Sequence, residues 1–298
     1  MIVFILNILF ACTHLCAGEY KNPTLEIINS IPQQDREEIK SLFKNLFKIH
    51  TFAYSLYGDK PMTYGDVCLE GNSLFWTYEI CQLDQLYKEI LEIYSEPCVL
   101  TKKRWEIWKK YNNRFRMKKY LLMEKSIGKR KRIFLINKEA FRKIIDNEID
   151  IFKRIIGKEI SSEKLLSEFQ SENTNVLDLL NDSEGLLGIL LGFGKHNSML
   201  FQKREDILDD LEWKKNSHIY RLEELKNKLN LANNKLQSLH EHDPYIIASI
   251  NRVCFVADTE HDETVKLRKK YDNLNRKINE IYSREDWFEQ TLIQLTSD

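Results

Sequence analysis

The sequence predicts an α+β protein that is mostly helical, with a small antiparallel sheet. Gly (10) and Pro (5) are scarce among the 298 residues, as in many helix-rich chains. Two apolar runs within residues 120–136 flank a short glycine-containing turn, which is typical of a β-hairpin. Two stripes of apolar residues in the last third have the spacing of amphipathic helices.

The N-terminal segment MIVFILNILFAC is apolar except for Asn7, and no charged side chain appears before Glu19. A bilayer span needs about 20 apolar residues, so this run predicts a signal peptide over residues 1–18. The remaining chain, 19–298, is expected to form a single mostly helical domain, with a C-terminal helical subdomain at about 205–298 as an alternative. Export would place the protein in the periplasm, the envelope or the medium; an uncleaved segment would leave it in the cytoplasm.

Which cysteines the mature chain contains depends on whether this segment is removed. The LFAC sequence at 9–12 loosely resembles a lipobox, which would make Cys12 a lipidated N-terminus. Removal of residues 1–18 leaves four cysteines, for which two disulfides with three alternative pairings, or buried free thiols, are both open. These four are Cys68, Cys81, Cys98 and Cys254.

The first predicted helix is long. Ser30 is expected to cap it and Pro32 to lie in its first turn. Apolar residues keep helical spacing over 39–57, until the GDKP sequence at 58–61 ends the helix. His50 lies on the apolar stripe, so we interpret it as a hydrogen-bonded core residue and not as a ligand.

Two more helices are predicted at 76–94 and 101–115. The second carries its aromatic residues on one face, as a core-facing helix does, so its tryptophans are expected to be buried. The aromatic residues are Trp105, Trp108, Tyr111 and Phe115.

The hairpin at 120–136 turns at the GKRK sequence 128–131. Asn137 is then expected to cap a helix over 138–156 that Gly157 closes.

Two further helix starts are predicted between residues 161 and 194. Ser161 or Ser162 is expected to cap a short helix, and Asp182 or Ser183 to open the glycine-rich segment at 185–194.

The last third predicts two long amphipathic helices, on the leucines of 222–239 and the apolar residues of 267–281. Each is short of three clean heptads, so an intramolecular antiparallel pair is favoured over a dimerising coiled coil. Residues 251–257 between them are expected to supply a third strand.

The glycine-rich segment does not match a phosphate-binding loop. Gly188 and Gly194 are separated by five residues where a P-loop has four, and His196 follows Lys195 where Ser or Thr is required. We therefore expect Gly188 and Gly192 to permit close packing of helices.

Charge is balanced overall, with 45 Lys+Arg against 45 Asp+Glu, but not locally. Residues 101–132 hold fourteen Lys/Arg and two Glu, and residues 159–188 hold seven Asp/Glu and one Lys. The aromatic residues within the basic stretch have core spacing, which argues against a base-stacking platform for nucleic acid. Its cations are interpreted as a solvated face whose partner would be an anionic envelope surface or an acidic protein.

No recognisable catalytic motif is present. The sequences HEHD at 240–243 and HDE at 261–263 contain metal-capable side chains but no HExxH pattern, and they are interpreted as solvated helix-end residues. The sequence also lacks a GxSxG element. We therefore expect no metal and no cofactor, and the sequence favours a non-enzymatic protein.

One polar cluster is predicted from two sequence-distant loops. Asp59 and Lys60 lie beside one apolar helix, and Lys195, His196 and Asn197 lie at the end of the glycine-rich segment. Neither a helix stop nor a close-packed helix requires these polar residues, so the two loops are expected to be neighbours. Asp59 would then pair with Lys195 or orient His196, as structural support or as the rim of a binding site.

The sequences YSLYGDKPM (54–62) and GILLGFGKHNSMLF (188–201) resemble elements of a group of uncharacterised proteins from Chlamydia-like and other intracellular bacteria. The segment FVADTEHDET at 255–264, followed by a charged helix, is similar to their C-terminal part. The resemblance implies that the protein comes from an intracellular bacterium, and it implies no particular activity.

Taken together, these observations predict an exported, non-enzymatic protein that acts through protein or envelope contacts. The alternative is an enzyme or small-molecule-binding protein with a site between the GDKP loop and the GKHN turn.

Overall fold

The computed structural model describes residues 22–65, 98–128, 130–157, 159–171, 174–216, 237–238, 253 and 255–297. Several predictions lie outside these residues: the signal peptide, Cys12, the helix at 76–94 and the HEHD sequence at 240–243. The side chains of the four cysteines discussed above lie outside them as well.

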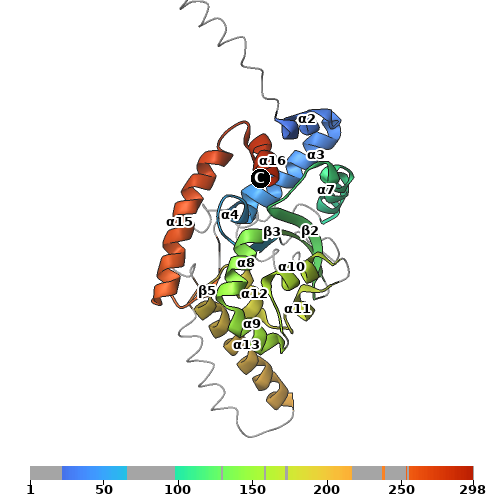
Figure 1. Cartoon of the computed structure of the whole chain (residues 1–298). Coiled ribbons are helices and arrows are strands. Elements are labelled where there is room, and N and C mark those ends of the chain that lie inside the picture. The colour runs from blue at the N-terminus through green and yellow to red at the C-terminus, as the bar shows by residue number, and fades with distance from the viewer. Residues whose placement is uncertain are drawn as a thin grey trace, which may run out of the picture.

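A three-stranded antiparallel sheet lies between two groups of helices (Figure 1). Its strand order is β1-β3-β2, with β1 at Met62–Tyr64, β2 at Tyr120–Ile127 and β3 at Arg130–Asn137. The hairpin is confirmed: Tyr120 pairs with Asn137 at the open end and Ile127 with Arg130 at the turn. The α+β class, mostly helical with a small sheet, is thus confirmed.

The central strand β3 is buried on both faces. Ile133 and Leu135 belong to one hydrophobic core, and Phe134 and Ile136 belong to the other. All four are 0% exposed. Side chains alternate between the faces of a strand, so each core receives every second residue. The two helical layers are therefore built on a shared strand.

The third strand of this sheet was expected at 251–257, and that prediction is wrong. The third strand is β1, which pairs with β3 through Met62–Ile136 and Tyr64–Phe134. Among the described residues of 251–257, Val256–Ala257 forms a strand, β5, which pairs with β4 (Gln237–Ser238) in a separate two-stranded sheet.

The first helical layer combines both ends of the described chain around one core. Its helices are α2 (Pro23–Ser30), α3 (Gln33–Phe43), α4 (Phe52–Leu56), α7 (Cys98–Tyr111), α15 (Asp262–Tyr282) and α16 (Trp287–Thr296).

The single helix expected up to residue 57 is broken. A π-helix at Lys44–Ile49 follows α3, and the chain is extended at the half-buried His50 (φ −88°, ψ 167°) before α4 begins. Ser30 does not cap α3, because it is the last residue of α2 and its hydroxyl donates to the Ile27 carbonyl. Apolar periodicity does not distinguish one helix from two that bury the same stripe.

The tryptophan prediction is confirmed. Trp105 is 2% exposed and Trp108 is 0% exposed. Trp108 stacks on Phe115 with ring centroids 5.3 Å apart and meets Phe43 edge-on at 5.0 Å. The helix ends earlier than expected, since a 3₁₀ turn at Asn112–Arg114 follows α7.

The second helical layer packs on the other sheet face. It consists of α8 (Lys138–Asn147), α9 (Ile149–Ile156), α10 (Ser162–Gln170), α11 (Val176–Leu179) and α12 (Glu184–Leu190).

The caps predicted in this layer are confirmed. The side chains of Asn137, Ser161 and Ser183 each accept a hydrogen bond from an amide three residues later. Gly157 is left-handed (φ 71°) after α9. The helix expected over 138–156 is nevertheless divided at Glu148 (φ −115°, ψ 22°).

After α12, the chain turns into α13 (Lys195–Asn216), which runs away from the sheet. Of the two expected C-terminal helices, α15 is confirmed; the one at 222–239 lies outside the described residues except for β4. Thr24 of α2 and Thr296 of α16 share a hydrogen bond of 2.7 Å between their hydroxyls.

None of the helices in the described part of the chain has both the length and the apolar character to cross a membrane.

Candidate functional site

The GDKP loop, the α12–α13 corner and the start of α15 meet at one corner of the molecule. Lys60 Nζ lies 5.6 Å from the ring centroid of Phe193, and the Tyr271 hydroxyl donates to the Gly192 carbonyl at 2.6 Å. The two polar loops are therefore neighbours, as expected, although they touch through Gly192 and Phe193.

Gly192 allows this close approach. Its φ of +75° is a conformation that L side chains rarely adopt, and a Cβ there would lie 2.5 Å from the Tyr271 hydroxyl oxygen. Gly188 has a similar role on α12, where a Cβ would lie 2.7 Å from Ser198 Oγ of α13. The prediction that Gly188 and Gly192 permit close packing is confirmed.

Lys60 is fully enclosed, at 2% exposed. Its ammonium donates to the Met62 carbonyl at 2.9 Å and to Thr63 Oγ1 at 3.2 Å, and no carboxylate of the described chain pairs with it. Burial lowers the pKa of the Lys60 ammonium to about 7, because the charged form loses its hydration. Lys60 thus donates hydrogen bonds within the fold, and the surrounding residues shield it from solvent.

The N-termini of α13 and α15 are capped by the same few residues. Both carboxylate oxygens of Glu263 accept from the start of α13: the Lys195 amide at 2.9 Å and the His196 amide at 2.7 Å. His261 Nδ1 accepts from the Glu263 amide at 3.3 Å and so caps α15. A carboxylate at a helix N-terminus is favourable, and here it occupies the position that an anionic ligand would take.

Two histidines close this junction. The rings of His196 and His261 stack in parallel, with centroids 3.6 Å apart and a 2° interplanar angle. His196 Nε2 also lies 3.2 Å from Asp258 Oδ2. Partial burial acts to raise the pKa of Asp258, but hydrogen bonds from His196 and the Glu260 amide outweigh it and hold the pKa below its usual value.

Asn197 joins three segments and is 1% exposed. Its amide nitrogen donates to the Phe193 carbonyl at 3.1 Å and to the Thr264 hydroxyl at 2.9 Å. Its oxygen accepts from the Asp258 amide at 3.0 Å. Both polar atoms of the Asn197 side chain therefore bond within the protein.

The ion pairs differ from those expected. Asp59 does not pair with Lys195 or His196; it pairs with Lys270 of α15 at 2.7 Å. Lys195 pairs instead with Glu148, at the break between α8 and α9, at 2.6 Å. The five predicted residues thus lie around one corner but form no common set of free functional groups.

A small cavity lies beside this polar junction, and both Phe193 and Asn197 line it. It has a volume of about 230 Å³ and lies between β1, α12 and the first turns of α13. Ser198 Oγ is buried there and has no hydrogen-bond partner in the described structure. The lining residues are Tyr64, Glu184, Leu187, Gly188, Leu191, Phe193, Asn197, Ser198, Phe201 and Phe255.

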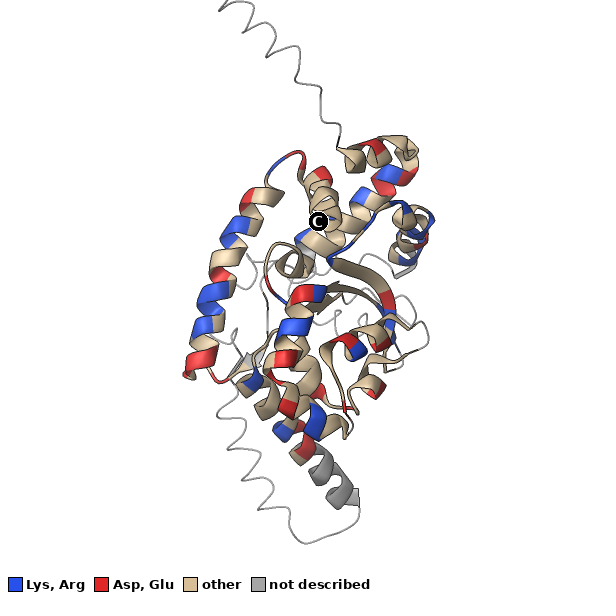
Figure 2. Ribbon diagram, in the orientation of Figure 1, with Lys and Arg blue, Asp and Glu red and all other residues tan. Residues whose placement is uncertain are grey.

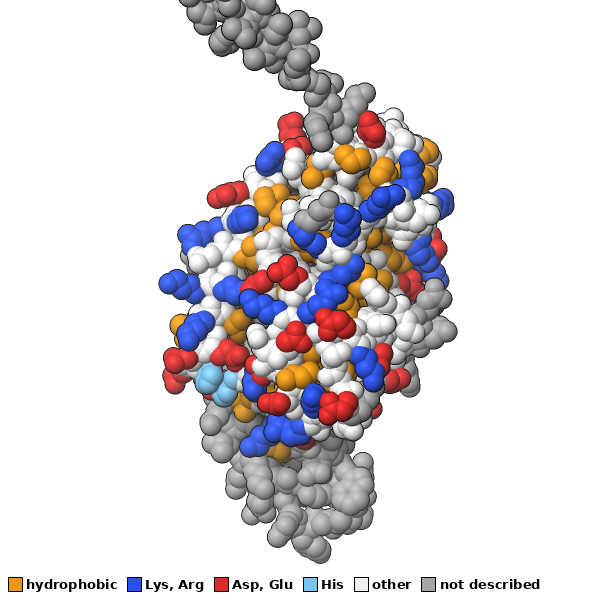
Figure 3. All heavy atoms as spheres, viewed as in Figure 1, with side chains coloured by type: hydrophobic (Ala, Val, Ile, Leu, Met, Phe, Trp, Pro, Cys, Tyr) orange, Lys and Arg blue, Asp and Glu red, His pale blue; other side chains and the backbone are white. Residues whose placement is uncertain are grey.

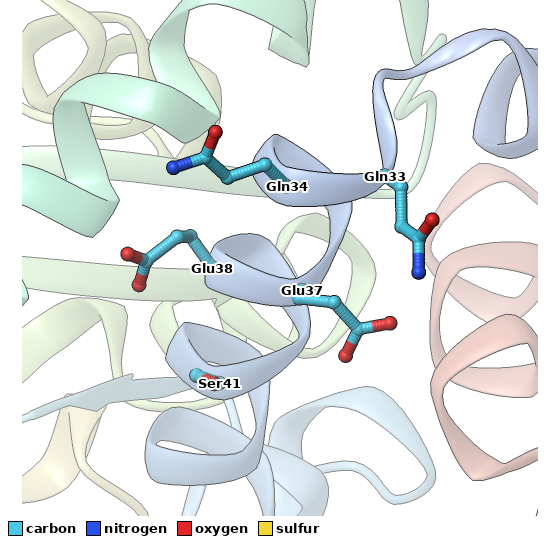
Figure 4. A pocket seen from close by; sticks show the side chains of 5 residues that line it. All are labelled: Gln33, Gln34, Glu37, Glu38 and Ser41. Carbon is cyan, nitrogen blue, oxygen red and sulfur yellow. The ribbon is translucent and has the colours of Figure 1, made fainter.

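A second hollow runs along α3 and is open to solvent. Figure 4 shows its polar side chains, with Gln34 and Glu38 on one side of the helix and Gln33 and Glu37 on the other. Glu38 is engaged by Arg104 at 2.9 Å and Lys103 at 3.3 Å. The described residues that line this hollow all belong to α3.

The basic surface consists of the exposed side of α7 and the loop after it, residues 98–119. This stretch carries nine Lys/Arg and one Glu, while its tryptophans face the core. Figures 2 and 3 show Lys and Arg gathered over α7, the following loop and the start of α8. Five of its cations are exposed and pair with no carboxylate of the described chain: Lys102, Lys110, Arg114, Arg116 and Lys119.

In the described part of the chain, no group of three or more His, Cys, Asp or Glu side chains is arranged to hold a metal ion.

Comparison of the chain with protein-family models, with curated proteins and with solved structures found no match.

Sequence reasoning missed the residues that complete the corner. Ser198 was visible only as the last residue of the polar sequence KHNS at 195–198, because its close contact with Gly188 of α12 depends on tertiary packing. Glu263 and Asp258 were visible only as acidic residues near a helix start, and their contacts with α13 span more than sixty residues of sequence. Tyr271 was predicted to lie on the apolar face of the helix at 267–281. The hydrogen bond from its hydroxyl to Gly192 depends on tertiary packing.

Proposed function

We propose that the protein is an exported, non-enzymatic protein of an intracellular bacterium that binds anionic envelope surfaces through its basic surface. The observation that carries this proposal is the five exposed cations of residues 98–119 without carboxylate partners. Each Lys or Arg near an anionic membrane contributes about 1 kcal/mol to binding.

The arrangement of these cations favours headgroups over nucleic acid. Trp105 and Trp108 of α7 are buried, and the half-buried Tyr111 donates its hydroxyl proton to Asp35, so the tryptophans of this helix are not free to stack on a base. The cations lie on a helix face and a loop, and none of them lines either of the two hollows described above. A diffuse array of positive charge suits a surface of mobile anionic headgroups.

The polar corner supports a non-enzymatic role. Lys60 is enclosed, Glu263 accepts from two helix amides and Asn197 is fully bonded. A catalytic group needs access to a substrate in hydrogen-bond reach, and these groups are committed to the fold.

Vesicle co-sedimentation tests the membrane proposal. The protein should sediment with vesicles of phosphatidylcholine and phosphatidylglycerol at low salt, and be released as salt rises. The variant Lys110→Gln, Arg114→Gln, Arg116→Gln, Lys119→Gln should bind at least about tenfold more weakly. The control removes four exposed cations from α15 instead: Lys266→Gln, Arg268→Gln, Lys269→Gln, Lys277→Gln.

Equal binding to pure phosphatidylcholine, or equal loss in the α15 control, would contradict the proposal. Binding to soluble polyglutamate but not to vesicles would assign the basic surface to an acidic protein partner.

Export is tested separately, by the intact mass of the protein from its native host. Cleavage between Cys16 and Lys21 removes roughly eighteen residues. A mass that includes the whole segment would contradict export by this route.

A further inference from the structure

Two histidines lie at the N-terminal ends of two helices and face each other. His196 is in the first turn of α13, and His261 is the N-cap of α15. Their rings are parallel, with centroids 3.6 Å apart and 2° between the planes. The His196 side chain is 34% exposed, and Figure 3 shows histidine at the surface beside the start of α15. Protons from solvent can therefore reach the pair.

His261 can cap α15 only while its ring is neutral. Its Nδ1 accepts from the Glu263 amide at 3.3 Å, so the neutral ring carries its proton on Nε2. A second proton would bind Nδ1 and remove this acceptor, because both nitrogens of a charged imidazole are donors. Protonation thus breaks the cap and places a positive charge at the positive end of a helix dipole.

The cap of α15 also governs the contact between α15 and α13. The Glu263 amide is held by His261, and the Glu263 carboxylate accepts from the Lys195 and His196 amides. Fraying of the first turn of α15 would therefore withdraw the acceptor from the start of α13. One proton on His261 is thus linked to the ends of both helices.

One carboxylate compensates a charge on this pair. His196 Nε2 lies 3.2 Å from Asp258 Oδ2. Partial burial acts to raise the pKa of Asp258, but hydrogen bonds from His196 and the Glu260 amide, together with positive charge on either ring, lower it. Asp258 therefore favours a first proton on the pair. A second proton would place two cations in rings 3.6 Å apart.

The other charged groups at this junction are engaged elsewhere or lie in solvent. The Glu263 carboxylate is held by two helix amides, and Lys195 of α13 pairs with Glu148. Glu260 and Asp262 are exposed, so solvent and salt screen their charge. Within the described chain, Asp258 is the one carboxylate in ion-pair range of either ring. The second proton has no equivalent partner.

We propose that the stacked His196–His261 pair is a pH-sensitive switch, in which a second proton on the pair releases the first turn of α15 from the start of α13. Imidazoles ordinarily change charge between about pH 5 and 8, so the corner should be closed above about pH 7 and loosened near pH 5. The inference does not depend on the basic surface of α7 and the loop after it.

The sign of the effect follows from proton counting. The closed corner binds fewer protons than the open one, so its stability is present at neutral pH and is lost as the pH falls. The released segment includes Phe255, which stacks on Phe193 with ring centroids 4.8 Å apart. Opening would therefore also loosen an aromatic contact of the adjoining cavity.

Amide hydrogen exchange of the full chain tests the switch, with protection factors corrected for the intrinsic exchange rate at each pH. Between about pH 7.5 and pH 5, protection of the Lys195, His196 and Glu263 amides should fall at least about fivefold, as the loss of a helix cap predicts. Amides of β3, which lies in the sheet, should lose less protection than these three.

Three substitutions separate the switch from general acid sensitivity. His261→Asn keeps a capping oxygen and cannot be protonated, so the three amides should stay protected at low pH. His261→Ser is a second cap of this kind, in case the asparagine variant does not fold. His196→Gln removes one of the two facing charges and should reduce the fall without abolishing it.

The matched control is His50→Asn, at a half-buried histidine just before α4, which should leave the fall in protection unchanged. Equal protection of the three amides at both pH values overturns the proposal, as does an equal loss at every amide of the protein. A fall that persists unchanged in His261→Asn, His261→Ser or His196→Gln also overturns it, and so does its absence in His50→Asn.

Discussion

A single buried amine, Lys60, links protonation to stability. Its hydrogen bonds to Met62 and Thr63 hold the GDKP loop against β1. Because burial lowers the pKa of Lys60 to about 7 in the folded protein, the folded chain loses this proton well before the unfolded chain does. An unfolded lysine has a pKa of about 10.4.

The direction of this pH dependence follows from the number of protons that the folded and unfolded states bind. Below about pH 7 both states carry the proton, and the full cost of the buried charge is present. Between about pH 7 and 10 the unfolded chain binds more protons, so the Lys60 contribution to stability rises with pH. We expect a gain on the order of 2 kcal/mol in the free energy of unfolding between about pH 6.5 and 9.

Urea denaturation at several pH values measures this gain. Lys60→Met should remove the rise, whereas Lys110→Met, at an exposed position, should retain it. Identical profiles for wild type and Lys60→Met would refute this account.

Trp108 tests the assignment of α7 to the core. The side chain is 0% exposed and packs on Phe43 and Phe115. Trp108→Ala should lower the free energy of unfolding by about 3–5 kcal/mol, because it leaves a large cavity. Tyr111→Phe, which removes only the hydrogen bond to Asp35, should cost about 1 kcal/mol. If Trp108→Ala melts like wild type, the aromatic face of α7 is not a core face.

At the scale of elements, α13 and α15 share one capping arrangement. Glu263 belongs to the first turn of α15, yet both of its oxygens accept from the start of α13. The positive ends of two helix dipoles thus meet around one carboxylate. This arrangement fixes the corner on which the cavity is built.

Glu263→Ala should lower the free energy of unfolding by about 1–2 kcal/mol, since it leaves two helix amides without an acceptor. Hydrogen exchange at the Lys195 and His196 amides should accelerate. Asp262→Asn is the matched control in the same helical turn; its side chain is exposed, and it should cost only a few tenths of a kcal/mol. Equal effects of the two variants would show that Glu263 acts as a general charge and not as a cap.

The elements that local residues specify could be predicted from the sequence. The hairpin has its glycine turn, and Asn137, Ser161, Ser183 and Gly157 mark helix ends through hydrogen bonds that span only a few residues. The strand β1 could not be predicted, because three residues carry no usable alternation and Met62–Tyr64 becomes a strand only by pairing with β3.

The candidate site was predictable only in part, for a similar reason. Asp59, Lys60 and Lys195–Asn197 were predicted because they are polar residues beside glycines. Their interaction partners lie far along the chain. Asp59 pairs with Lys270, and Lys195 pairs with Glu148. Which of several acidic or basic residues becomes the partner is decided by the tertiary fold.

At the scale of the whole molecule, the two helical layers share the strand β3. Ile133 and Leu135 serve one core, and Phe134 and Ile136 serve the other. Phe193 packs against both cores as well. Loss of packing on one face of β3 therefore affects the layer on the other face.

We expect a single cooperative unfolding transition. Leu135→Ala and Phe134→Ala each perturb one core, and each should lower one common melting temperature, by a destabilisation of about 2–5 kcal/mol. Differential scanning calorimetry reports this directly. Amides of β3 should exchange most slowly, since this strand is paired on both sides and covered on both faces. Two resolved transitions, one for each variant, would contradict a shared core.

The contact between α2 and α16 also bears on when the protein folds during its synthesis. Phe288, Leu292 and Leu295 of α16 fill the same core as the first helices, so that core stays open until the ribosome has made α16. Contacts between residues so distant in sequence close late. This side of the protein is therefore expected to fold only after α16 has left the ribosome. An extended chain is much narrower than the folded three-layer body, so delayed closure would favour threading through a membrane channel before folding.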